Sequence, residues 1–525
     1  MANIKTPNQK KAYKDLSKRL NQYTKKVLAI YTMLAKEAVS IALSEGYDGN
    51  DEFLFANYPK TKRKIKSLLD FFYQNMKAIV YSGISDEWEN SNTLQDLLVR
   101  RVMKAYTKRI GQKRVTEYYE KNNAAKEAFK HRTINGLNLS QRIWNQQEDV
   151  KKSLERALST GIKKGMSAVK LSKRVSKYLN DYPSLAKDYK KKYGKAVDVS
   201  GCEYRSVRLA RNEINMAYRA AEQTRWHSLD FIKGIEIKTS GSHPKDDMCD
   251  NLAGKYPKGF QWSGWHVNCM CYAVPIIMSE EEYWSDKPKE LYTDVPDDFN
   301  KWIRENSDKI NTSKSLPYFL TDNANFIGNS NVRFTVRRKG EYLKYKNNPN
   351  YKNVEINSDG GVKAVHISHN THNYTEKNFF NGKMDGDDLE NEFIEKAFSN
   401  GHSVIFCEEG QKGKTGNEMT ALDMILNGRL MDLASITSSS RDYRNQLLNK
   451  SRQLKKFNSR EDITTEYHDV CLYFHDASMF EEKKLIEGYK RMIETLKNKK
   501  TSTPLKNVLC AILRGNKLEI KEYNF

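Results

Sequence analysis

Long apolar runs, cysteines and prolines are all scarce in this sequence. No stretch of 18 or more apolar residues occurs, so we expect no membrane-spanning helix, and the N-terminal segment lacks the apolar core of a secretory signal. Seven cysteines in 525 residues, an odd number, argue against a disulfide scaffold and favour a reducing compartment. Together with a mean hydropathy of −0.79, these absences indicate a polar protein that does not contact membranes.

Positive charge, by contrast, is in excess. The chain has 89 lysines and arginines against 66 acidic residues, a net charge of +23. Runs such as Lys60 to Lys66 and Lys190 to Lys195 contribute to this excess. Such a field favours polyanionic partners, namely DNA, RNA or an acidic protein surface. The alternative is that each run is the solvated face of a lysine-rich helix.

Four segments of different character predict a multidomain α+β protein, since the chain is too long for one compact core. Residues 1–230 are predicted to be helical, because apolar residues recur at spacings of three and four. Residues 231–280 form a loop-rich Cys/His module with many glycines and prolines. Residues 281–361 are predicted to be a connector, and residues 362–525 an α/β domain.

Three of the seven cysteines lie within 23 residues of each other. Cys249, His266, Cys269 and Cys271 offer thiolates and an imidazole, which are the ligands of tetrahedral zinc. A loop-rich segment has little core of its own, and a bound metal would stabilise it. The alternative is that these small side chains pack together beneath the two tryptophans of the same segment.

The region before these cysteines has a recognisable order of features. A helix that begins at Arg208 carries Arg211 and Glu213, and it is followed by a short strand, a first cysteine and a closing HVNCMC motif. This order resembles the Mu protein F family of phage head morphogenesis proteins, whose closing motif resembles HPNCRC. Val267 stands where that family has proline. The resemblance covers roughly residues 150–278.

The resemblance implies a virion component. Members of the family sit beside the portal in the procapsid and assist assembly or DNA delivery. The expected partners are therefore the portal, other head proteins, and DNA or RNA, in the oligomeric context of the capsid. The expected location is the phage head and, during assembly, the host cytoplasm. We expect Glu213 to form a structural ion pair with Arg208 and Arg211, because no nucleophile with its base is recognisable nearby.

A hairpin signal stands out in the C-terminal part of the chain. Asn427-Gly428 between two apolar runs predicts a two-residue type I′ turn, which fixes the hairpin register. In that register Asp423 opposes Asp432 on one face, with Cβ atoms about 5 Å apart. Two like charges so placed destabilise the hairpin unless a cation lies between them, and a hard divalent ion suits carboxylate oxygens. The register therefore predicts a divalent-cation site.

Further acids precede this hairpin. Glu392 lies in a predicted helix, and Glu408 and Glu409 end a predicted strand. The layout of acids resembles the PD-(D/E)xK nuclease core, and the order of elements resembles the tRNase domains of contact-dependent growth-inhibition toxins. The resemblance implies that Asp423 and Asp432 hold magnesium, with Glu392 as the helix acid near the metal and Glu408 or Glu409 as the strand-end acid.

Ala434 stands where this nuclease family has a lysine. That lysine positions or polarises the attacking water, which alanine cannot do. Loss of one preorganised donor costs about 10²- to 10³-fold in rate. We therefore expect an impaired nuclease, unless Lys412, Lys414 or Lys450 reaches the site from another element. An ordinary hairpin in an unrelated fold is the alternative.

Three functions follow from these observations. The first is a portal-associated minor head protein that carries a nuclease-like domain, impaired by the loss of the lysine. The second is a metal-dependent RNase or DNase that is delivered with the virion. The third is a bacterial toxin unrelated to phage, which the lack of a secretion signal and of internal repeats disfavours.

Overall fold

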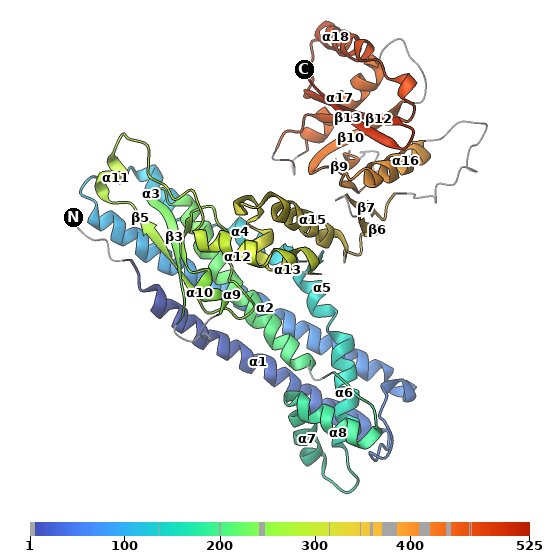
Figure 1. The fold of residues 1–525 in the computed structure, drawn as a ribbon. Coiled ribbons are helices and arrows are strands. Elements are labelled where there is room, and N and C mark those ends of the chain that lie inside the picture. The colour runs from blue at the N-terminus through green and yellow to red at the C-terminus, as the bar shows by residue number, and fades with distance from the viewer. Residues whose placement is uncertain are drawn as a thin grey trace. The chain divides into compact units, whose positions relative to one another are not determined.

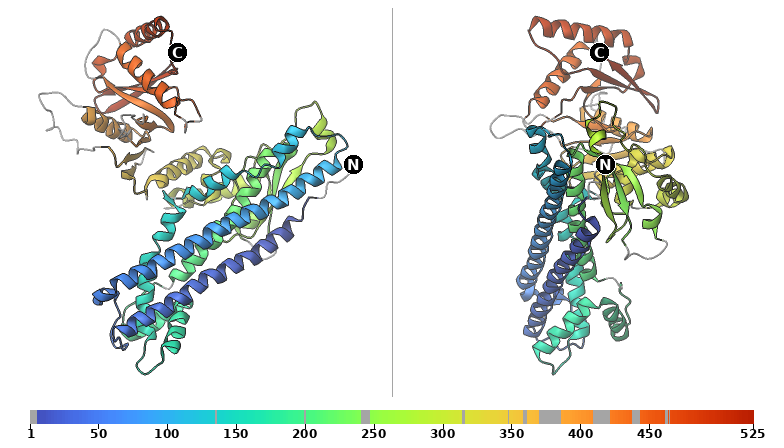
Figure 2. Two further views of the ribbon diagram at one scale, coloured as in Figure 1. Left: turned by 180° about the vertical axis from the view of Figure 1, so that it is seen from behind. Right: turned by 90° about the vertical axis from the view of Figure 1, so that its left-hand side faces the viewer.

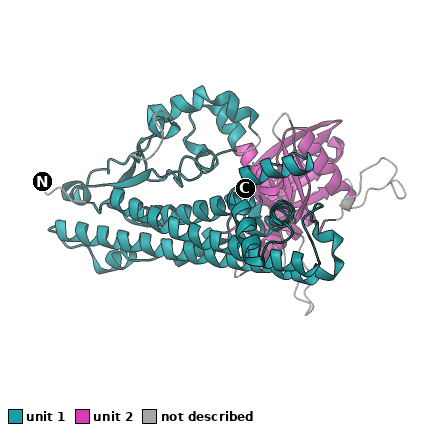
Figure 3. Ribbon diagram, turned by 90° about the horizontal axis from the view of Figure 1, so that it is seen from below, with its two compact units in different colours: residues 1–336 teal, residues 337–525 magenta. Residues whose placement is uncertain are grey.

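The computed structural model divides into two compact units, Met1–Val336 and Arg337–Phe525 (Figure 3). It confirms the α+β class: the first unit is mainly helical and holds a Cys/His cluster, and the second contains an eight-stranded mixed sheet. The residues that the structure describes are 6–134, 136–198, 201–240, 247–313, 316–346, 348–357, 361–369, 386–408, 421–436, 443–460, 463 and 465–525.

Three long helices, α1 (Gln9–Ser44), α2 (Lys62–Ala105) and α9 (Cys202–Ser228), run side by side in the first unit (Figures 1 and 2). The apolar residues that recur at helical spacing form their shared core, and α9 is buried on most of its sides. The helical prediction for the N-terminal region is therefore confirmed.

Shorter elements complete this helical part. They are 3₁₀ helices η1 (Phe55–Asn57) and η2 (Pro59–Thr61), helices α3 (Gln112–Tyr118), α4 (Asn123–His131), α5 (Leu139–Trp144), α6 (Gln147–Gly161), α7 (Ala168–Asn180) and α8 (Tyr182–Tyr193), and the strand pair β1 (Thr133–Ile134) and β2 (Leu137–Asn138).

Helix α1 is long and apolar enough, by length and composition alone, to cross a membrane. Half of its most apolar window is buried inside the unit. Leu16, Val27 and Leu34 are fully buried in the shared helical core. The burial is that of a core helix, and the expectation that this chain avoids membranes stays a prediction.

The Cys/His module is a small sheet that rests on α9. Its strands follow the order β4 (Gly254–Pro257), β3 (Ile232–Lys238) and β5 (Tyr272–Ile277), all antiparallel. Helix α10 (Met248–Asn251) lies between β3 and β4 along the chain, and α11 (Glu280–Trp284) follows β5.

The predicted connector is not a separate tether. Its helices α12 (Asp297–Glu305), α13 (Ser307–Thr312) and α14 (Tyr318–Thr321) bury Phe299 and Phe319 in the same core as the tryptophans of the module. The two compact units meet at 336/337, within α15 (Ser330–Lys346), and the finer boundaries expected at residues 230, 280 and 361 stay predictions. The many Asn, Tyr and acidic residues give this segment the composition of a linker. Its few buried aromatic residues could therefore not be recognised from composition.

The second unit is built on the strand order β13-β12-β11-β10-β9-β8-β7-β6. Strands β7/β8, β10/β11 and β11/β12 pair in parallel, and the other neighbours pair antiparallel. The strands are β6 (Tyr351–Ile356), β7 (Val362–His366), β8 (Val404–Phe406), β9 (Met424–Leu426), β10 (Arg429–Ile436), β11 (Asp469–Phe474), β12 (Asn507–Arg514) and β13 (Lys517–Asn524).

Helices cover both faces of this sheet. Alternate residues of β11 point to opposite sides, so Leu472 packs with α17 (Arg444–Asn458) and α18 (Glu482–Asn498), whereas Tyr473 packs with α16 (Gly386–Ser399). A short 3₁₀ helix, η4 (Ala477–Met479), lies between β11 and α18. The predicted order of helix, strand, hairpin, helix and strand is confirmed, and it places α17 over the face that holds the acid pair.

Candidate functional site

The β9–β10 hairpin brings Asp423 and Asp432 together. Met424 pairs with Met431 and Leu426 with Arg429, which is the predicted register, and Asn427 and Gly428 have the positive φ angles (49° and 84°) of the turn. Asp432 is completely buried. Asp423 accepts a hydrogen bond of 2.7 Å from the backbone N–H of Leu433, so its carboxylate is fixed beside the other strand.

Lys450 of α17 reaches both acids. Its Nζ lies 3.1 Å from Oδ1 of Asp432 and 3.5 Å from Oδ2 of Asp423. Leu447 and Leu454, one turn to either side, are fully buried in the core and hold the helix against the sheet. Of the three lysines considered from the sequence, Lys450 is thus at the site, and the other two lie outside the described residues.

The electrostatics of the two acids differ. Burial and the neighbouring Asp423 carboxylate raise the pKa of Asp432 to about 9. Burial would also raise the pKa of Asp423, but the Asp432 carboxyl, the Lys450 ammonium and the Leu433 amide together lower it. Near neutral pH the pair therefore holds one proton, and a bound dication would displace it.

The buried acid fits a cation ligand. Both oxygens of Asp432 are buried, and Oδ1 lies 3.1 Å from the Lys450 ammonium. Two neighbouring carboxylates are a donor set that suits a hard divalent cation. Asp423 and Asp432 can therefore hold such an ion.

The alanine position lies on the same face as the acids. Ala434 follows Asp432 by two residues and packs toward α17 and α18. A lysine from α17 thus reaches the two acids from the face where a lysine at position 434 would stand. Gln446, one helical turn before Lys450, has a buried Oε1 that accepts no hydrogen bond among the described residues. Sequence reasoning missed Gln446, although its i, i+4 spacing from Lys450 is visible.

The remaining predicted acids are not brought into this group. Glu392 lies on the opposite face of the sheet, where its Oε2 accepts a hydrogen bond of 2.7 Å from the hydroxyl of Tyr473. Glu408 is an exposed residue after β8, and Glu409 lies outside the described residues. The role of Glu392 as helix acid near the metal is therefore not supported, because a helix residue can face either the metal end or the core.

The Cys/His cluster is compact. Sγ of Cys249 lies 3.2 Å from Nε2 of His266 and 4.0 Å from Sγ of Cys269, and the sulfurs of Cys249, Cys269 and Cys271 lie within 4.8 Å of one another. In tetrahedral zinc thiolates, with Zn–S of about 2.3 Å, sulfurs lie about 3.8 Å apart. The three cysteines thus form a buried cluster that can bind a metal.

A contact of His266 and the lowered pKa of Cys269 both favour binding of a cation by the cluster. Nδ1 of His266 lies 2.9 Å from the carbonyl oxygen of Val267, a contact that leaves Nε2 free to accept a metal. The thiols of Cys249 and Cys271 lower the pKa of Cys269, so Cys269 ionises most easily. Asp247 is a further oxygen donor near His266, at 3.5 Å.

Helix α9 fixes the loop that carries these ligands. Arg219 donates to the carbonyls of Ser263, Cys269 and Cys271, and Asn215, one turn earlier, also donates to Cys269. The guanidinium stacks 4.5 Å from the Trp262 ring centroid and is fully buried. Arg219 is a positioning residue that the sequence did not single out, since its partners are backbone oxygens.

Glu213 of α9 lies in a buried ion-pair network. Glu213 is fully buried and bridges Arg132 at 2.7 Å and Arg142 at 2.8 Å. The ion-pair interpretation holds, but the partners were wrong. Arg211 instead donates to Asn21 and Thr24 of α1.

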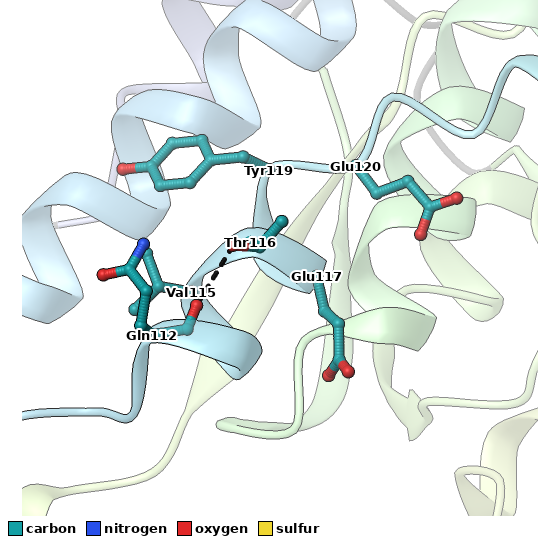
Figure 4. A pocket seen from close by; sticks show the side chains of 6 residues that line it. All are labelled: Gln112, Val115, Thr116, Glu117, Tyr119 and Glu120. Atoms are coloured by element: carbon teal, nitrogen blue, oxygen red, sulfur yellow. Dashed lines mark hydrogen bonds between the residues drawn. The ribbon is translucent and has the colours of Figure 1, made fainter.

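One shallow pocket has no link to either cluster. It lies on α3 and the residues just after it, and Thr116 donates a hydrogen bond within the helix to Gln112 (Figure 4). The side chains that line it are Gln112, Val115, Thr116, Glu117, Tyr119 and Glu120. It contains no cysteine, histidine or buried acid, so it does not point to chemistry.

Comparisons of the chain with protein-family models, with curated proteins and with solved structures each found no match.

Proposed function

We propose that this chain is a minor head protein of a tailed phage and that its second unit is a metal-dependent nuclease. The observation that carries the nuclease proposal is Lys450, whose ammonium lies within 3.5 Å of both Asp423 and Asp432. It supplies the cationic donor that Ala434 lacks. The proposal therefore departs from the expectation of an impaired domain.

Each residue has a definable task. Asp423 and Asp432 would hold magnesium, which supplies Lewis-acid charge to the scissile phosphate. Asp423 stays ionised near neutral pH, because the neighbouring carboxyl, the ammonium and the amide lower its pKa. Lys450 would donate a hydrogen bond to the attacking water or a phosphate oxygen, and Gln446 would accept one from that water.

The test is cleavage of tRNA and of duplex DNA by the full chain with magnesium. We expect Lys450→Ala to lower the cleavage rate by about 10²- to 10³-fold, as the loss of one preorganised donor does. Ala434→Lys in that background should restore part of the rate, because it returns the charge to the same face. Equal rates for the native chain and Lys450→Ala would contradict the proposal.

The head-protein proposal rests on the first unit. The stretch that resembles the Mu protein F family closes into one module, with Cys249, His266, Cys269 and Cys271 gathered against α9. We propose zinc as its metal, since three thiolates and an imidazole favour it over magnesium. The proposed partners are the portal, other head proteins and nucleic acid, in the virion and, during assembly, in the host cytoplasm.

Sedimentation tests this second proposal. The protein should copurify with capsids from a phage lysate, and zinc should be present at one atom per chain. Recovery of the protein only outside capsids would overturn the head assignment without affecting the nuclease result.

A further inference from the structure

One end of the first unit concentrates the positive charge of the chain. Residues 163–195 contain eleven basic and two acidic residues, a net charge of +9 out of +23 for the whole protein. Ten of the eleven are exposed lysines that extend from the end of α6 to the end of α8. A density of this kind exceeds what solubility requires.

The fold brings a second run of basic residues to the same end of the first unit. Residues 60–66, which begin α2, hold five further basic residues. The segment just before them is fixed to α6 and α8: the N–H of Phe53 donates to Ser159, and Lys192 donates to the carbonyl of Gly49. Figures 1 and 2 show the start of α2 at the same end of the unit as α6, α7 and α8. We call residues 60–66 and 163–195 the basic end.

The acids at the basic end are already engaged. Glu52 pairs with Lys195 at 2.6 Å, Asp188 accepts from the hydroxyl of Tyr178, and Asp181 caps the start of α8. Among the ion pairs of the described residues, Lys195 is the one lysine of the basic end that has an acid partner. Within the residues of the basic end, the positive charge is therefore left largely uncompensated.

The aromatic side chains of the basic end face inward. Tyr178, Tyr182 and Tyr189 are each less than a tenth exposed, and Tyr193 is half-buried. Proteins that bind single strands stack bases on exposed aromatic rings, whereas duplex binding relies on contacts to phosphates. The surface therefore suits a regular phosphate backbone better than unstacked bases.

We propose that the basic end binds double-stranded DNA through its phosphates, without reading sequence. This inference lies outside the nuclease unit and does not rest on the nuclease proposal. The lysines of α8 and of the α2 start would contact phosphates of the same duplex, because the fold brings both to one end. Duplex DNA carries one charge per about 1.7 Å of axis, so a duplex offers phosphates to both groups of lysines.

The experiment measures binding of the full chain to a 30-base-pair duplex in magnesium-free buffer, over a series of salt concentrations. Two triple variants remove exposed lysines, K187Q/K190Q/K191Q and K60Q/K62Q/K64Q. Each should lower the slope of log affinity against log salt by about 2 to 3, since each phosphate contact contributes about 0.9. The combined variant should bind at least about tenfold more weakly.

The matched control is K483Q/K490Q/K497Q on α18, which removes three exposed lysines of the second unit. It should leave duplex affinity and salt slope close to native. A control that weakens binding as much as either variant would overturn the proposal, and so would equally tight, equally lysine-dependent binding of single strands or of an acidic peptide. Unchanged thermal unfolding of the variants verifies that the fold is intact.

Discussion

The Cys/His cluster of the first unit and the acid pair of the second unit both gather potential metal ligands, but the two units hold these ligands in place differently. In the first unit, three thiols and an imidazole come from a stretch of 23 residues, and α9 holds that stretch from outside through Arg219. In the second unit, two acids from a hairpin meet a lysine from the next helix. The first cluster has no cationic side chain among its ligands, whereas the second has its own ammonium.

This difference shows how each unit depends on metal. A cluster of soft ligands without a built-in charge gains its stability from the ion that it binds. An acid pair that is bridged by lysine can fold without the ion, because the ammonium and the proton held by the pair already offset the repulsion. We therefore expect the first unit, and not the second, to need metal for stability.

Removal of metal should have the largest effect. A chelator should lower the thermal transition of the first unit by the equivalent of about 4 kcal/mol, the value expected for a ligand at about 1,000 times its Kd. The transition of the second unit should stay unchanged. Differential scanning calorimetry with and without chelator measures both, and Cys271→Ser serves as the matched variant. A shift confined to the second unit would reverse the comparison.

Loss of the built-in cation should come next. Lys450→Ala should destabilise the second unit by about 3 kcal/mol, since removing one partner leaves a buried charge uncompensated. Adding Asp423→Asn should recover most of this loss, because Asp423 carries the negative charge of the pair near neutral pH. Urea unfolding in metal-free buffer measures both variants. If Asp423→Asn destabilises the Lys450→Ala protein further, the charge argument is wrong.

A glycine tests how tightly the Cys/His loop is held. Gly264 has a φ of +120°, and a Cβ there would lie 2.3 Å from Nη1 of Arg219. We expect Gly264→Ala to destabilise the first unit by about 2 kcal/mol through backbone strain and the displaced guanidinium. Gly165→Ala is the control, since its φ is also positive but nothing lies near its Cβ. Equal losses in the two variants would show that the Arg219 contact is unimportant.

The smallest effect, for a change of one pH unit, should be a pH dependence in the helical core. Burial raises the pKa of Glu222, which accepts a hydrogen bond from Tyr13, to about 8. Because the folded state keeps a proton that the unfolded state has lost, stability should fall by up to about 1.4 kcal/mol per pH unit between pH 4.5 and 8. Glu222→Gln should remove that slope. Chemical unfolding of both proteins across this pH range gives the comparison.

Local signals predicted much of this protein. The Asn427-Gly428 turn fixed the hairpin register and so placed Asp423 opposite Asp432. The cysteine spacing predicted a compact cluster, because its members are close along the chain. Each of these predictions needed only neighbours within about 25 residues.

Contacts between residues far apart in the chain could not be predicted from the sequence. Nothing local distinguishes the face of α16 that carries Glu392, and it points to the core. The partners of Glu213, Arg132 and Arg142, lie 81 and 71 residues away. Lys450 was one of three candidates, and only the packing of α17 on the sheet selects it.

The position of α1 has a consequence for synthesis. The hydroxyl of Tyr13 donates to Glu222, which is synthesised 209 residues later. The apolar face of α1 packs in part against α7 and α9, which are also synthesised later. At about 5–20 residues per second, the ribosome delivers those helices roughly 10–40 s after α1 has emerged. During that interval α2 can cover only part of the apolar stripe of α1, so the nascent chain should be a client of cotranslational chaperones.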